Sequence, residues 1–84
     1  MPTLYVKTGC PFCIMVQSKI EDMGLEVNEL NIADDTNGED LIELGGKRQV
    51  PFLVDEKNDV KMYESSDIID YLEKTYGNTE QTTE

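Results

Sequence analysis

Two cysteines, Cys10 and Cys13, are the side chains of this sequence best suited to covalent chemistry. They are the only cysteines in the chain, they are separated by Pro11 and Phe12, and the chain contains no histidine. A disulfide between residues so close together closes a very small loop and adds little stability, which argues against a structural role. The spacing instead predicts a reversible redox pair, in which one thiolate attacks a disulfide and the second thiol resolves the mixed disulfide.

The position of the pair predicts which cysteine attacks. Residues 3–6 form a short β-branched and aromatic run that is typical of a strand, and Pro11 suits the first position of a helix. Cys10 would then be the N-cap, where unpaired backbone N–H groups and the helix dipole favour a thiolate. We therefore expect Cys10 to be the nucleophile. Cys13 lies one turn further along, closer to the core, and is expected to be the resolving thiol.

Other uses of two cysteines stay open at this point. A zinc site is disfavoured, and no metal is expected, because zinc needs about four ligands and the chain has a single cysteine pair without histidine. A pair of inert buried cysteines is disfavoured by the position between a strand and a helix. An iron–sulfur cluster shared between two chains is a further alternative.

Other features could belong to the same site. Val50-Pro51 precedes a predicted strand, where proline cannot donate to the ladder. It is either a plain strand-entry proline or a cis-proline beside the cysteines that leaves the Val50 backbone free to pair with an extended substrate. Ser65 or Ser66 could cap the last helix, or this helix start could bind a carboxylate through N–H and hydroxyl groups. Lys7, at the end of the first strand, could hold another carboxylate.

Hydrophobic periodicity and turn residues predict the elements that position these side chains. Helices are expected at residues 11–23, 39–44 and 66–76. Strands are expected at residues 3–6, 27–32, 52–54 and 60–62, with a hairpin turn at 56–59. Gly24 should end the first helix, and Leu41 and Leu44 of the second helix should face inward. The order βαβαββα predicts an α/β, thioredoxin-like fold, with a four-stranded mixed sheet flanked by three helices.

Length and composition limit the function. The 84 residues fit one domain, which we place at residues 1–77, followed by a flexible polar tail at 78–84. With 38% hydrophobic and 30% charged residues the chain is of the globular class. The net charge of −11 argues against binding to nucleic acid or to anionic membranes. The sequence has no apolar run of membrane-spanning length and no signal-peptide core, so we expect a cytoplasmic monomer.

Lys7, the Cys10-Pro11-Phe12-Cys13 motif, Val50-Pro51 and the serine-capped last helix together resemble a glutaredoxin. The resemblance extends from residue 3 to about residue 76. It implies a thioredoxin fold and the reduction of protein–glutathione mixed disulfides and protein disulfides, with glutathione as the co-substrate. The implied partners are glutathione and glutathionylated or disulfide-containing proteins. Cys10 and Cys13 would form the redox-active disulfide.

The resemblance also implies a glutathione site. Lys7 with Arg48 or Gln49 would meet the glycine carboxylate, and Val50 would pair with the cysteinyl backbone. The serines at the start of the last helix would hold the γ-glutamyl end. The full set of implied glutathione-binding residues is Lys7, Phe12, Arg48, Gln49, Val50, Pro51, Ser65 and Ser66.

Three positions depart from the glutaredoxin pattern. Phe12 replaces the usual tyrosine, and Gln49 replaces the usual threonine before Val-Pro. Glu64-Ser65 stands where a glycine pair usually precedes the last helix, and residues 53–72 (LVDEKNDVKMYESSDIIDYL) are similar to the amino-terminal domain of glutathione transferases. That domain also binds glutathione. A transferase needs a second, helical domain for its electrophile, however, and 84 residues are expected to leave no room for one.

We therefore expect a small dithiol glutaredoxin. One alternative enzyme is a glutaredoxin-like redoxin that is recharged by a reductase or by another thiol. One alternative without catalysis is an iron–sulfur carrier, which would hold a cluster between two subunits through Cys10 and two glutathiones. Another is a glutathione-binding module without turnover.

Overall fold

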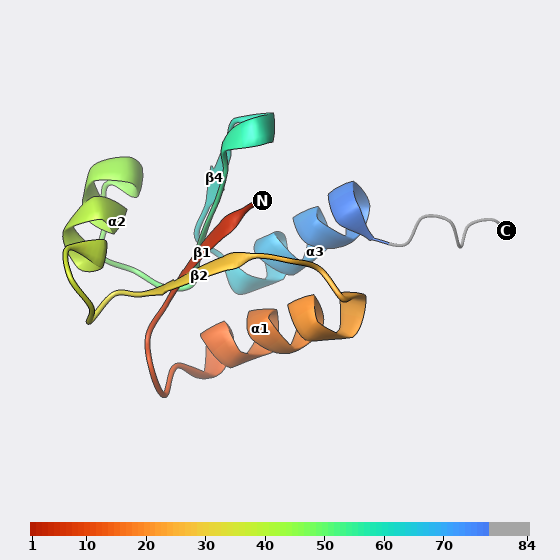
Figure 1. Cartoon of the computed structure of the whole chain (residues 1–84), viewed down its shortest axis with the longest axis horizontal. Coiled ribbons are helices and arrows are strands. Elements are labelled where there is room, and N and C mark those ends of the chain that lie inside the picture. The colour runs from red at the N-terminus through yellow and green to blue at the C-terminus, as the bar shows by residue number, and fades with distance from the viewer. Residues whose placement is uncertain (78–84) are drawn as a thin grey trace, which may run out of the picture.

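A mixed four-stranded sheet carries three α-helices in the computed structural model, which describes residues 1–77 (Figure 1). The strands are β1 (Thr3–Val6), β2 (Asn28–Asn31), β3 (Phe52–Asp55) and β4 (Val60–Met62). The helices are α1 (Pro11–Met23), α2 (Asn37–Gly45) and α3 (Ser65–Tyr76), and a 3-10 turn (Glu56–Asn58) joins β3 to β4. The predicted α/β, thioredoxin-like fold is confirmed. The predicted tail, residues 78–84, lies outside the described residues.

The strand order β2-β1-β3-β4 places β1 and β3 in the middle of the sheet. β1 and β2 are parallel, with Tyr5 opposite Leu30, and α1 forms the crossover between them. β3 is antiparallel to β1, with Tyr5 opposite Phe52, and β4 continues as the antiparallel edge. The loop end of β1 that leads to Cys10 therefore lies beside the start of β3, which follows Val50-Pro51.

Successive side chains of a strand point to opposite faces of the sheet, and this alternation divides the core in two. The cluster shared with α1 and α3 contains Leu4, Val6, Cys13, Val16, Ile20, Leu53, Ile68 and Leu72. The cluster shared with α2 contains Tyr5, Ile32, Leu41, Phe52 and Val54. Figure 1 shows the resulting layers, with α1 and α3 together on one face of the sheet and α2 on the other.

The ends of α1 agree with the prediction, whereas the ends of α2 differ from it. α1 has the predicted bounds because Pro11 occupies its first position and Gly24, with φ of +65°, forms its C-cap. α2 runs further than predicted at both ends, and Gly45 lies inside it while Gly46 forms its cap. β2 is shorter than the predicted strand at 27–32.

Two expectations about side chains are wrong. Leu44 is 39% exposed, because the side of α2 that meets the sheet contains Gly38, Leu41 and Gly45, and Leu44 lies about 90° away from it around the helix. Neither serine caps α3. Ser65 is already the first helical residue, and Glu64 occupies the N-cap position without a side-chain hydrogen bond.

A buried carboxylate ties β3 to α3 at the end of the sheet remote from the cysteines. Asp55 is 1% exposed, and its Oδ2 accepts hydrogen bonds from the hydroxyl groups of Tyr71 (2.5 Å) and Tyr76 (2.5 Å). Asn58 Nδ2 donates a third bond to the same oxygen (2.9 Å). Burial by itself raises the pKa of Asp55, but the hydrogen bonds from Tyr71, Tyr76 and Asn58 outweigh it and lower the pKa to about 2.

Replacing Asp55 by asparagine should remove an acid-sensitive part of the stability. The pKa of Asp55 is lower in the folded protein than its ordinary value of 3.8, so its contribution is present above about pH 4 and is lost as the pH falls toward 2. We expect Asp55→Asn to lower the free energy of unfolding at about pH 5 by about 2 kcal/mol, and this difference to shrink toward about pH 2. Urea unfolding across this pH range measures both values.

The matched control is Asp59→Asn, which removes an exposed carboxylate from the same hairpin. Its free energy of unfolding should follow that of the wild type at every pH. An Asp55→Asn variant whose deficit is the same at both ends of the pH range would contradict the assigned role of the Asp55 carboxylate.

Candidate functional site

Cys10 is the N-cap of α1, as the sequence predicts. Its backbone is extended (φ −85°, ψ 113°), its carbonyl oxygen accepts from Ile14 N–H (3.0 Å), and its Sγ accepts from Cys13 N–H (3.2 Å). Gly9, with φ of +81°, makes the preceding turn in a conformation that residues with a side chain rarely adopt. Cys10 is half-buried, and its Sγ lies at the positive end of the helix dipole, a position that stabilises negative charge on sulfur.

Cys13 lies in a different environment, one helical turn further along. It is fully buried in the cluster between the sheet, α1 and α3, and both cysteines are free thiols in this structure. Burial, and secondarily the hydrogen bond with the Cys10 side chain, raises the pKa of Cys13 to about 12, although a hydrogen bond from the Lys7 backbone acts in the opposite direction. The pair therefore combines an accessible sulfur with one that stays protonated at neutral pH.

Asn31, at the end of β2, holds the loop that carries Cys10. Its Nδ2 donates to Thr8 Oγ1 (2.9 Å), and its Oδ1 accepts from Ala33 N–H (2.9 Å). Its backbone carbonyl accepts from Asn37 Nδ2 (2.9 Å), at the start of α2. Sequence reasoning missed this residue. The available signal was an asparagine at a strand end, a residue that commonly bonds the backbone two positions ahead.

A pocket of about 290 Å³ lies next to the first turn of α1. Its lining residues are Phe12, Gln49, Val50, Pro51, Tyr63, Glu64 and Ser65. The Val50-Pro51 peptide is cis, which is the second of the two interpretations that the sequence left open. Within residues 1–77, the backbone N–H and C=O of Val50 make no hydrogen bond, which leaves both without an internal partner. Cys10 and Val50 pack against the same buried cluster.

The structure brings most of the predicted glutathione-binding residues together, but not all of them. Lys7, Arg48 and Ser66 are exposed and do not line the pocket. The Arg48 guanidinium lies over the start of α2, where its Nη2 would be 3.3 Å from a Cβ placed on Gly38. The contacts of all eight predicted residues with glutathione remain predictions.

Two pocket residues, Tyr63 and Glu64, were not among the predicted ones. Both stand directly before Ser65, in a stretch where the sequence analysis assigned ligand contacts to the serines alone. Glu64 is the one carboxylate of the lining, and Lys47 contributes a cation at the margin, with Nζ 5.0 Å from the centre of the Tyr63 ring. The pocket therefore has charges of both signs around it.

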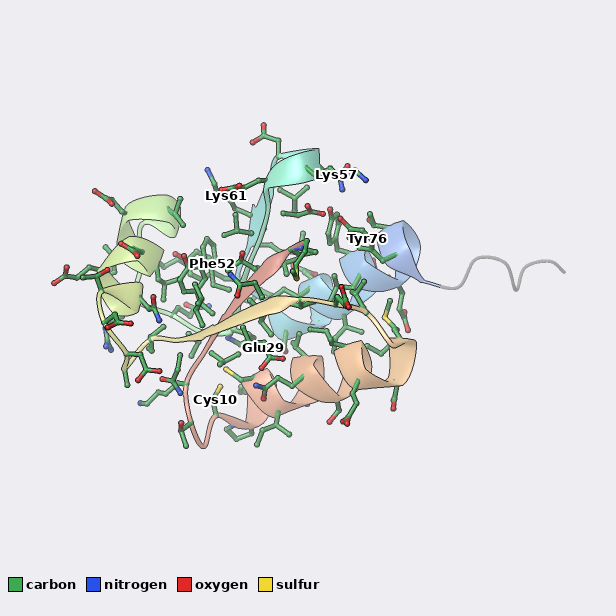
Figure 2. All side chains as sticks on the ribbon, viewed as in Figure 1. Cys10, Glu29, Phe52, Lys57, Lys61 and Tyr76 are labelled. Atoms are coloured by element: carbon green, nitrogen blue, oxygen red, sulfur yellow. The ribbon has the colours of Figure 1, made fainter. Side chains whose placement is uncertain are left out.

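Figure 2 shows Cys10 well apart from Tyr76, which donates a hydrogen bond to the buried carboxylate of Asp55. Cys10 lies at the loop end of β1, whereas Tyr76 is the last residue of α3.

No group of three or more metal-ligating side chains occurs in the part of the chain that the structure describes. Within the same residues, no helix is both long and apolar enough to cross a lipid bilayer.

Alkylation should distinguish the two cysteines. We expect iodoacetamide at about pH 8 to modify Cys10 roughly 100 times faster than Cys13, because the thiolate is the reactive form and burial keeps Cys13 protonated. Mass spectrometry of peptides from the reduced protein measures both rates. In denaturant the two rates should converge, and similar rates in the folded protein would contradict the assigned asymmetry.

Comparison with known proteins places the chain in a family. A family profile described as "Glutathione S-transferase, N-terminal domain" matches residues 4–80, and no curated protein sequence matches. The chain is similar to the crystal structure of a glutathione S-transferase from the Antarctic clam Laternula elliptica, with 30% identity and a TM-score of 0.78 over 92% of this chain and 36% of that one.

Two further solved structures are similar to this chain over part of their length. A delta-class glutathione transferase from Nilaparvata lugens has 26% identity and a TM-score of 0.76 over 96% of this chain and 38% of that one. A glutathione transferase homolog from Sulfitobacter, solved with bound glutathione, has 27% identity and a TM-score of 0.71 over 88% and 36%. This chain thus spans between a third and two fifths of the length of each of these three structures. The similarity predicted for residues 53–72 is confirmed, and the chain belongs to the family of glutathione S-transferase N-terminal domains.

Proposed function

We propose that this chain is a glutathione-dependent thiol–disulfide oxidoreductase of the glutaredoxin type, with Cys10 as nucleophile and Cys13 as resolving thiol. The observation that carries the proposal is the asymmetry of the pair. The Cys10 Sγ is accessible and accepts a hydrogen bond at a helix N-terminus, whereas Cys13 is buried and its pKa is raised to about 12. A glutathione S-transferase N-terminal domain with this pair has the groups that disulfide exchange requires.

The reaction proceeds by thiolate substitution at sulfur. The Cys10 thiolate attacks the glutathione sulfur of a protein–glutathione disulfide, the old S–S bond breaks, and the protein thiolate leaves and takes a proton from water. A glutathione thiolate then attacks the Cys10–glutathione disulfide, which releases oxidised glutathione and restores the Cys10 thiolate. With a protein disulfide, Cys13 can instead attack Cys10 and close the pair, and two glutathiones reduce that disulfide afterwards.

The raised pKa of Cys13 affects the choice between these routes. Cys13 must lose its proton before it can attack, and burial disfavours that loss. Free glutathione, which reaches its thiolate form more readily, therefore competes well for the mixed disulfide on Cys10. For glutathionylated substrates we expect Cys13 to be dispensable.

The pocket beside α1 suits glutathione by shape and charge. The backbone groups of Val50, which have no hydrogen-bond partner within residues 1–77, can pair with the cysteinyl residue, as in β-strand addition. Glu64 can accept from the ammonium group, and Ser65 with the N-terminus of α3 can donate to the neighbouring carboxylate. Lys47 precedes the lining residues Gln49 and Val50 and lies over the ring of Tyr63, where it could meet the second carboxylate. The Sulfitobacter homolog, solved with glutathione, supports the choice of ligand.

A second candidate function is transfer of glutathione to an electrophile. The match of residues 4–80 to a glutathione S-transferase domain favours it. In that reaction a glutathione thiolate in the pocket would displace a leaving group such as chloride, and Cys10 would not change its oxidation state.

The proposed function predicts a specific pattern of mutant activities. With a glutathionylated peptide as substrate and glutathione as reductant, wild type and Cys13→Ser should both turn over, within about tenfold of each other. Cys10→Ser should lose at least about a thousandfold, because it lacks the nucleophile. The release of the peptide thiol measures the rate.

A parallel assay with 1-chloro-2,4-dinitrobenzene separates the two candidates. Activity with this electrophile that survives in Cys10→Ser, together with no turnover of the peptide by wild type, would contradict the oxidoreductase and support the transferase. Activity of Cys10→Ser with the peptide would also overturn the assignment of the nucleophile.

A further inference from the structure

Tyr63 holds the loop that forms one wall of the pocket. It follows β4, and its hydroxyl group donates to the Lys47 carbonyl oxygen (2.9 Å) and accepts from Lys47 N–H (3.1 Å). Residues 47–51 have no regular secondary structure. In the described part of the chain, the backbone of this segment makes no other hydrogen bond. The phenol is therefore the polar attachment of the segment to the rest of the fold.

The Tyr63 ring is itself fixed by close packing. It stacks on the fully buried Phe52, with ring centres 4.4 Å apart and an angle of 33° between the planes. Gly45 lies against the hydroxyl end of the ring, since a Cβ on this residue would overlap the Tyr63 hydroxyl and lie 2.7 Å from Cζ. The hydroxyl group thus has one position, and the Lys47 backbone is held at that position.

The attached segment contains pocket residues. Gln49 and Val50 follow Lys47 within three positions, both line the pocket, and Tyr63 lines it as well. The Lys47 ammonium lies over the Tyr63 ring, so the same tyrosine also orients the cation at the pocket margin. We propose that Tyr63 is a positioning residue, which holds residues 47–50 in the conformation that binds glutathione and thereby sets the affinity. The inference rests on the proposed function.

The test removes the hydroxyl group and keeps the ring. In Tyr63→Phe, the Lys47 amide should lose its protection from hydrogen exchange. The Kd of S-methylglutathione, a probe without a free thiol, should rise about three- to tenfold, because two hydrogen bonds that order the site are lost. In the turnover assay, Tyr63→Phe should raise KM for glutathione and leave kcat nearly unchanged.

Tyr71→Phe is the matched control. It also removes a hydrogen-bonded tyrosine hydroxyl, but this one contacts Asp55, remote from the pocket. It should lower the free energy of unfolding without changing the Kd or the exchange of the Lys47 amide. Gly45→Ala places a methyl group against the Tyr63 hydroxyl and displaces it. This variant should raise the Kd at least as much as Tyr63→Phe.

The outcomes separate this inference from the proposed function. A wild type that binds S-methylglutathione, with Tyr63→Phe binding it equally well and the Lys47 amide equally protected, would overturn the role of Tyr63 alone. A wild type that does not bind the probe would overturn the glutathione site and, with it, any role of Tyr63 in affinity. An equal rise of Kd in Tyr71→Phe would show a general loss of stability and would also overturn the inference.

Discussion

The hydrogen bond from Cys13 N–H to Cys10 Sγ is the contact on which the chemistry proposed for this protein depends. It exists because Cys10 is the last residue before α1 and its sulfur takes the place of a capping oxygen. The same helical register places Cys13 on the side of α1 that faces the sheet, in line with Val16 and Ile20. One helix start therefore produces an accessible sulfur and a buried one. A shift of the helix by a single residue would move both sulfurs at once.

The sheet places the pocket next to this helix start. β1 ends just before the loop that contains Gly9 and Cys10. The antiparallel strand β3 begins next to this end of β1, just after the cis Val50-Pro51 peptide. At the other end of β3, Asp55 is bonded to tyrosines of α3. Ser65, the first residue of α3, lines the pocket, so one end of this helix is held by a buried carboxylate and the other end contributes to the site.

Most helices and strands could be predicted from the sequence, because their local residue patterns are each typical of one kind of element. Proline at position 11 and glycine at position 24 mark the ends of α1, and alternating apolar residues mark the strands. Predictions based on which residues face inward were weaker in α2, since the glycines Gly38 and Gly45 pack against the sheet and leave Leu44 exposed. The bonds of Asn31 to Thr8 and of Tyr63 to Lys47 could not be predicted, because each joins segments that meet only in the folded chain.

Membership of the glutathione S-transferase N-terminal domain family is shown by the match over residues 4–80, whereas redox chemistry is proposed from Cys10 and Cys13. The most direct test is to incubate the Cys13→Ser protein with oxidised glutathione and to analyse its peptides by mass spectrometry. The account predicts a single stable disulfide between glutathione and Cys10, since no second cysteine can resolve it. A protein that forms no such adduct, while a denatured sample does, would contradict the proposal that Cys10 is the nucleophile of a glutathione-dependent reaction.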